Sequence, residues 1–174
     1  HDRQEHVWAE ASVERPPERR AGGAEFGHIR IDRQRALKAE VLGDALRRFG
    51  GVEHDVDVRE IDPALAPGVS ADGTGWRTRV RLQVAEDGAV GPYAARSHTV
   101  VPVASVPLAV ASLGELAPLS SHFPGARAVD LVAPSVGEPA LVVLDAERMP
   151  RSGPRPTITE RVGDRTFVLD RDGF

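Results

Sequence analysis

The sequence has 174 residues, which is enough for one domain or for a domain with an additional arm. The net charge of −4 at pH 7 and the isoelectric point of about 5.9 exclude a uniformly basic nucleic-acid-binding protein, so any such contact must come from a local patch. The chain contains no cysteine, which excludes disulfides, thiolate metal ligands and cysteine nucleophiles.

The N-terminal third predicts an arm followed by one helix. Residues 1–20 are polar and contain two adjacent prolines, a composition typical of a connector. Asp32 is a suitable N-cap for an amphipathic helix that extends to Phe49, where Gly50 and Gly51 end it. Apolar residues recur along this helix at spacings of three and four, at Ala36, Leu37, Val41, Leu42, Ala45, Leu46 and Phe49.

The rest of the chain predicts short strands and one further helix. The strands are expected at residues 56–61, 75–84, 89–94, 98–103, 128–133, 140–145, 157–162 and 165–169. Turn residues at 86–88 and 163–164 favour hairpins, residues 108–116 predict a short helix, and residues 63–75 and 150–156 predict loops. Because strands and helices do not alternate regularly, we expect an α+β fold with a mostly antiparallel sheet and two helices.

Residues 75–84 alternate strictly between two kinds of side chain. In an extended strand, successive side chains point to opposite faces, so Arg77, Arg79 and Arg81 share one face and Val80 and Leu82 the other. The guanidinium groups would be about 6.6 Å apart, twice the rise per strand residue. That spacing is close to the distance between successive phosphates of a nucleic-acid strand. The row therefore either binds phosphates or forms the ordinary solvated face of an antiparallel sheet.

No catalytic or cofactor motif is present. The histidines are His1, His6, His28, His54, His98 and His122. None has metal-ligand spacing, and the chain has no nucleophile elbow, no dinucleotide-binding glycine motif and no P-loop. The residues by themselves thus favour a binding or accessory domain without catalytic, cofactor or metal site.

Several motifs together resemble the RNA uracil-5-methyltransferase family. Residues 21–24, read A-G-G-A, with 27–29 and then Gln34 and Lys38, resemble its C-G-G-C…Q-H-I…Q…K signature. Residues 76–81 are similar to its aromatic-R-x-R-x-R strand. Residues 97–108 resemble the segment that carries the last cluster cysteine before Pro-Leu, and residues 167–174 resemble the approach to its methyltransferase domain. The resemblance covers nearly the whole chain.

The resemblance implies a division into domains. Family members have an N-terminal RNA-binding barrel (TRAM domain), a central α+β domain and a C-terminal domain that binds S-adenosylmethionine. Residues 1–20 would be the connector from the barrel, and residues 21–174 the central domain. The adenosylmethionine loop, catalytic cysteine and general-base glutamate would lie beyond Phe174. With no initial methionine, secretory signal or long apolar run, we expect a cytoplasmic fragment without a membrane partner.

The chain departs from the family at its iron–sulfur cluster, whose ligands are thiolates. Ala21, Ala24 and Val106 stand at cluster-cysteine positions, and no cysteine lies near Arg15. We therefore expect no iron–sulfur cluster in this chain. We expect packing of Ala21, Ala24, Val106 and Phe26 against one another to replace it.

The family resemblance implies a substrate-contacting domain of an enzyme that methylates C5 of uridine in rRNA or tRNA. The candidate RNA-binding residues are Arg77, Arg79, Arg81, Arg96 and His98, the last two on a neighbouring strand. Arg96 and His98 also suit an ordinary surface. The arginine face could instead pack against the missing methyltransferase domain. A non-catalytic RNA- or protein-interaction domain is the alternative function.

Overall fold

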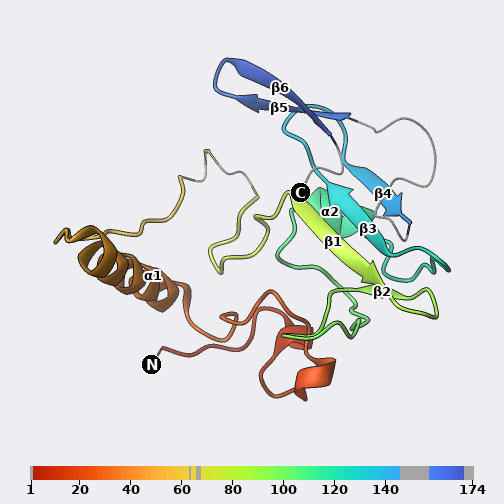
Figure 1. Cartoon of the computed structure of the whole chain (residues 1–174), viewed down its shortest axis with the longest axis horizontal. Coiled ribbons are helices and arrows are strands. Elements are labelled where there is room, and N and C mark those ends of the chain that lie inside the picture. The colour runs from red at the N-terminus through yellow and green to blue at the C-terminus, as the bar shows by residue number, and fades with distance from the viewer. Residues whose placement is uncertain (1, 63, 66–67, 146–156, 171–174) are drawn as a thin grey trace.

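The computed structural model describes residues 2–62, 64–65, 68–145 and 157–170 (Figure 1). This part of the chain contains two α-helices and two antiparallel sheets, so the predicted α+β fold is confirmed. The helices are α1 (Ile31–Ala45) and α2 (Ala111–Leu116), and the strands are β1 (Arg79–Val84), β2 (Val90–Gly91), β3 (Ala128–Val132), β4 (Ala140–Leu144), β5 (Thr157–Val162) and β6 (Arg165–Asp170). Short 3₁₀ turns occupy Ala9–Ala11 and Pro17–Arg19, and a π-helical turn, Leu46–Gly50, continues α1.

The main sheet has four strands in the order β2-β1-β3-β4. The predicted turn joins β1 to β2. Gly88 has a φ of 88° there, and the side chain of Asp87 accepts a hydrogen bond from the backbone N–H of Ala89 at 2.9 Å. The predicted strands at 128–133 and 140–145 are confirmed as β3 and β4. The register pairs Arg81 with Asp130 and Leu82 with Val129.

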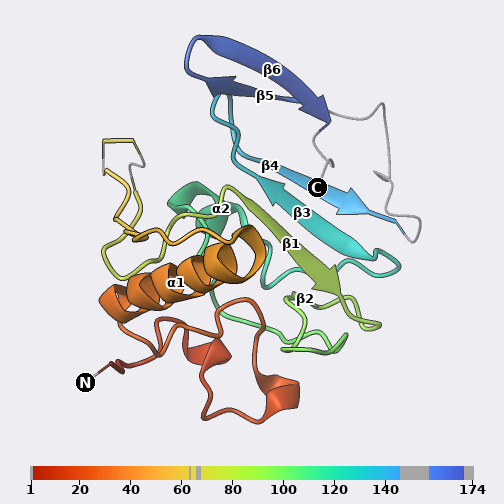
Figure 2. The same cartoon turned by 60° about the vertical axis from the view of Figure 1, so that its left-hand side comes forward.

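One face of this sheet packs on the main hydrophobic core. Val80 and Val84 pack against this cluster and Leu82 belongs to it, so the apolar side of the alternating segment is buried as predicted. The fully buried members of the cluster include Leu82, Leu113 of α2, Val90, Val129 and Leu131. In both views α1 and the β5–β6 hairpin lie on different sides of the main sheet (Figures 1 and 2).

The opposite face of the sheet is not an ordinary solvated face. Beside the arginines, β3 presents Ala128, Asp130 and Val132, each with at most 2% of its surface exposed. Ala128 also belongs to a second buried cluster with Val142 and Leu144 of β4. The arginine side chains of β1 are therefore next to buried apolar surface.

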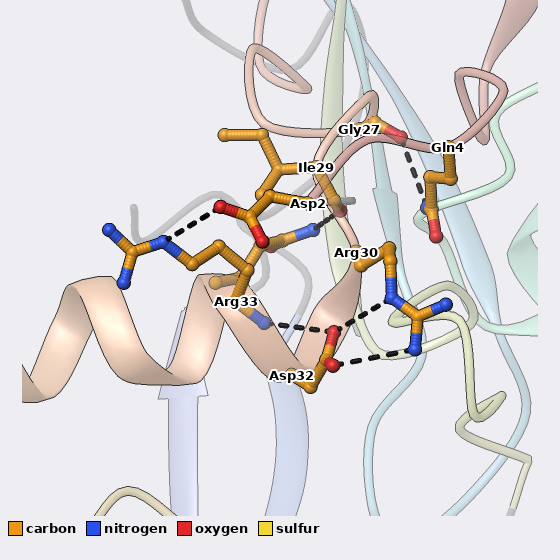
Figure 3. A network of polar contacts seen from close by, with 8 residues as sticks. Asp2, Gln4, Gly27, Ile29, Arg30, Asp32 and Arg33 are labelled. Atoms are coloured by element: carbon orange, nitrogen blue, oxygen red, sulfur yellow. Dashed lines mark hydrogen bonds and ion pairs between the residues drawn. The ribbon is translucent and has the colours of Figure 1, made fainter.

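Helix α1 differs from the prediction at both its start and its packing. Arg30 is the N-cap and Asp32 lies in the first turn, so the assignment of Asp32 as N-cap is wrong. Asp32 instead accepts a hydrogen bond from the backbone N–H of Arg33 at 3.0 Å and pairs with Arg30 (Figure 3). No residue of α1 is buried, and Val41 and Phe49 are 71% and 90% exposed. The amphipathic pattern therefore does not place this helix on the core.

The strand predicted from residue 75 begins four residues later. The backbone N–H groups of Trp76 and Arg77 both donate to the carbonyl of Leu108, at 3.1 and 2.8 Å, and Val110 donates to the carbonyl of Arg77. The backbone of Trp76 and Arg77 therefore pairs with residues 108–110, which precede α2, and not with a strand of the sheet.

Two other predicted strands are wrong. Residues 56–61 form no regular element. Residues 98–103 form no regular strand: they make an isolated bridge between Tyr93 and Val100, and their backbone hydrogen bonds include those from Ala94 to Thr99 and from Val101 to Pro92. A positive φ of 59° at Arg96 turns the chain tightly there, and Pro102 lacks the N–H that a ladder needs.

The predicted C-terminal hairpin is confirmed as β5 and β6, which turn at Gly163 with a φ of 61°. The connection at 150–156 and the tail at 171–174 lie outside the described residues. In the part of the chain that is described, neither helix has the length and apolar composition needed to cross a bilayer.

Candidate functional site

The three arginines of the alternating segment have different surroundings. Arg81 forms a two-point ion pair with Asp130, with nitrogen–oxygen distances of 2.6 and 2.7 Å. Arg77 donates to the carbonyl of Gly23 at 2.9 Å, and its guanidinium carbon lies 5.0 Å from the centre of the Trp76 ring. Arg79 lies opposite Val132 in the sheet. The equally spaced row expected from the sequence is thus divided among separate environments, while its contact with RNA stays a prediction.

Two of the predicted residues act on the charge of Glu25. Its carboxylate accepts a hydrogen bond from the backbone N–H of Gly23 at 3.0 Å. Backbone hydrogen bonds are the main cause that lowers the pKa of Glu25, and the charges of Arg77 and Arg96 lower it further. Both arginines are therefore close enough to act on one carboxylate. His98 is exposed, and its ring meets that of Tyr93 edge-on at 5.2 Å.

A groove of about 510 Å³ opens beside Arg77 and was not predicted from the sequence. Its walls are residues 23–27, the first half of α1, residues 58–61 and residues 69–76. Its chemically distinctive side chains are Glu25, Phe26, Arg35, Lys38, Arg59, Glu60, Asp72 and Trp76. Cations, carboxylates and two aromatic rings therefore share one hollow.

This groove is lined by several residues of the segments that resemble the family. Gly23, Ala24, Gly27, Gln34, Lys38 and Trp76 all line it, although they come from three separate stretches of sequence. The convergence of these motif positions is the signal by which the groove could have been found.

Gln34 shows how the groove wall is held. Its side-chain nitrogen donates to the carbonyl of Ile29 at 2.8 Å and to that of Phe26 at 3.1 Å, tying α1 to the preceding loop. Gln4 donates to the carbonyl of Gly27 at 3.2 Å from the other side of this loop (Figure 3). A Cβ on Gly27 would collide with the ring of His6, so only glycine fits at this position without a shift.

The positions that match the cluster cysteines lie in the core. Ala21, Ala24 and Val106 are 2%, 8% and 8% exposed and belong to one buried cluster, while their direct packing against one another stays a prediction. Phe26 does not join them, because it is 55% exposed and lines the groove. The expectation for Phe26 is therefore wrong.

The groove presents side chains that can bind a ligand. Among the described residues no group of three or more histidine or acidic side chains could hold a metal ion. The aromatic rings of the groove can stack on a flat group, and its cations and carboxylates can bind charged or polar groups of a ligand.

Comparison with known proteins relates the chain to RNA methyltransferases. No family model matches it. It is 32% identical over 148 residues to an uncharacterized RNA methyltransferase of Streptomyces avermitilis, 28% over 182 residues to one of Streptomyces coelicolor and 26% over 171 residues to one of Corynebacterium efficiens.

These matches cover 81%, 89% and 88% of this chain but only 32%, 40% and 37% of the relatives. The chain thus spans well under half the length of the curated relatives it matches. The similarities support kinship with an RNA methyltransferase family.

Proposed function

We propose that this chain is the substrate-contacting part of an RNA methyltransferase that methylates C5 of uridine in rRNA or tRNA. The observation that carries the proposal is that several residues of the segments resembling the uracil-5-methyltransferase signature, among them Gly23, Lys38 and Trp76, line one groove. The names of the three relatives support the broader part of the proposal, methylation of RNA. Another part of the protein would bind S-adenosylmethionine and carry the catalytic groups.

The predicted arginines and His98 would position the RNA. The charges of Arg77 and Arg96 both act on Glu25. We expect Arg79, in β1, and His98, in the loop after β2, to contact the RNA as well. Phosphate contacts fix the register of a nucleic acid, whereas base contacts specify its sequence. Arg81 is a different case, because its ion pair with the buried Asp130 gives it a structural role whether or not it also meets RNA.

The central domain would be held together without an iron–sulfur cluster. The chain has no thiolate to ligate one, and the three matching positions are filled by buried Ala21, Ala24 and Val106. Side-chain packing in the main core would stabilise this region in place of the metal cluster.

Methyl transfer by the complete encoded protein tests the proposal directly. The protein is incubated with S-adenosylmethionine carrying a labelled methyl group and with total rRNA and tRNA, and the nucleosides are then separated. The expected product is 5-methyluridine. A different methylated nucleoside would contradict the uridine C5 assignment. RNA binding without methylation would favour the alternative, a non-catalytic RNA-interaction domain.

RNA binding by the 174-residue chain is tested with a uridine-containing stem-loop at several salt concentrations. Arg77→Gln with Arg96→Gln should weaken binding and reduce the salt slope by about 0.7–0.9 per lost phosphate contact. Arg47→Gln with Arg48→Gln is the matched control, because it removes the same charge beyond the far end of α1. Equal affinity and equal salt slope in both double variants would count against the arginine contacts.

A further inference from the structure

We propose that the groove is a subsite for one unpaired nucleotide of the RNA, with its base stacked on Trp76 in the hollow that also contains Phe26, and its phosphate beside Lys38. This inference rests on the proposed function and specifies which part of an RNA the groove receives.

The two aromatic rings carry the first step. Trp76 is 51% exposed and Phe26 is 55% exposed, and both line the same groove although they come from different segments. Aromatic residues make up only 5% of the chain, so two half-exposed rings in one hollow are a concentrated apolar surface. Proteins bind the splayed bases of single-stranded RNA by stacking them on such rings.

Lys38 carries the second step. It is the only lysine of the chain, it is exposed, and it lines the groove. The other cations of the lining are already paired, Arg35 with Glu60 at 3.4 Å and Arg59 with Asp57. Within the described residues Lys38 forms no salt bridge, so its ammonium group is available to a phosphate.

The size and the acidic side chains of the groove restrict the ligand. A volume of about 510 Å³ is in the range of sites for one small molecule, roughly 300–1,000 Å³. Glu25, Glu60 and Asp72 also line the hollow and would repel a run of phosphates. Their oxygens can instead accept hydrogen bonds from the N–H groups of a base edge. An inserted nucleotide therefore fits better than a backbone track or a duplex.

Tryptophan fluorescence of the 174-residue chain tests the stacking. The chain has two tryptophans, and Trp8 is buried with 5% of its surface exposed, so a stacked base should quench Trp76 alone. An RNA stem-loop with an all-uridine loop should quench the emission, and a blunt duplex of equal length should not. Trp76→Leu should weaken stem-loop binding roughly 5- to 150-fold, the loss of one stacked base, whereas Trp76→Tyr should retain most of it.

Acetylation of the single lysine tests the phosphate contact independently. The chain is treated with an acetylating reagent with or without RNA, and the Lys38 peptide is quantified by mass spectrometry. The stem-loop should slow acetylation of Lys38 and the duplex should not.

The outcomes separate this inference from the proposed function. In one outcome the stem-loop binds in a salt-dependent way but neither quenches Trp76 nor slows the acetylation of Lys38. That result would overturn the subsite and leave the proposed function standing. Equal quenching by the duplex would also overturn the subsite. Failure of a folded chain, verified by circular dichroism, to bind any RNA would overturn both.

Discussion

At the scale of single residues, the ion pair between Arg81 and Asp130 joins a partly exposed arginine to a buried carboxylate. Asp130 is completely buried, whereas 24% of the Arg81 side chain is exposed. The two residues are direct cross-strand partners, and both carboxylate oxygens accept a hydrogen bond from the guanidinium. Removing one partner of such a pair leaves an uncompensated buried charge.

We therefore expect Arg81→Ala to lower the free energy of unfolding by about 3–5 kcal/mol. Urea titration followed by circular dichroism measures it. Arg47→Ala is the matched control, because Arg47 pairs with Asp44 at the same 2.6 Å distance but on an exposed helix surface. Its loss should cost about 1 kcal/mol or less. Equal losses in the two variants would mean that the burial of Asp130 adds nothing to the pair.

His6 provides a pH-dependent contribution to stability. Burial is the main cause that lowers its pKa from the ordinary value of 6.5, and the charges of His28 and Arg20 act in the same direction against backbone groups at Ala24 and Trp8. The unfolded chain therefore binds a proton more readily than the folded chain. The contribution is fully present above about pH 6.5 and is lost as the pH falls toward the lowered pKa.

His6→Asn should accordingly make the free energy of unfolding less dependent on pH below 6.5, the ordinary pKa. An asparagine oxygen can still accept the hydrogen bond that the backbone N–H of Trp8 donates to His6 Nδ1 at 3.1 Å. Urea titrations across the acid range measure the difference between the variant and the original chain. A difference that stays constant with pH would show that His6 does not titrate on unfolding.

At the scale of elements, the close approach of two segments explains why β2 contains a glycine. A Cβ on Gly91 would collide with the carbonyl oxygen of Val101, and Val101 donates a hydrogen bond to the carbonyl of Pro92 at 2.9 Å. The segment that was expected to be a strand at residues 98–103 is thus pressed against the backbone of β2.

Gly91→Ala should lower the free energy of unfolding by about 1–3 kcal/mol. The new methyl group would collide with the carbonyl oxygen of Val101, and this backbone atom cannot move aside as a flexible side chain could. Thermal and urea unfolding measure the loss. Gly114→Ala in α2 is the opposite case, since nothing lies within 4 Å of its added Cβ. It should stabilise the chain by about 0.5–1 kcal/mol through higher helix propensity. Destabilisation by both substitutions would contradict the distinction.

The elements that the sequence predicted correctly have local causes. The alternation in β1 and the glycine turns at Gly88 and Gly163 are decided within a few residues. Helix α1 was recognised from its period, but its packing depends on partners that a pattern does not specify. The groove needed three distant stretches to meet, and the pairing of Arg81 depended on β3, so neither could be derived from the arginine segment alone.

At the scale of the whole molecule, the described residues join the two sheets mainly through one short segment. The β5–β6 hairpin meets the loop after β3 through a bridge between Val136 and Thr159 and through hydrogen bonds from Ser135 to Glu160 and from Arg161 to Ser135. Every residue of β6 is exposed, whereas every residue of β3 is buried. Isolated two-stranded hairpins are marginally stable in water.

The hairpin should therefore open without unfolding of the main sheet. In native-state hydrogen exchange, the amides that pair β5 with β6 should exchange faster than those of β3, whose protection should approach the global free energy of unfolding. Ile158, 5% exposed, is the buried side chain of β5, so Ile158→Ala should accelerate hairpin exchange and leave β3 protection almost unchanged. Loss of protection in both sheets together would instead show one cooperative unit, in which the hairpin contacts at Ser135 and Val136 transmit opening to the main sheet.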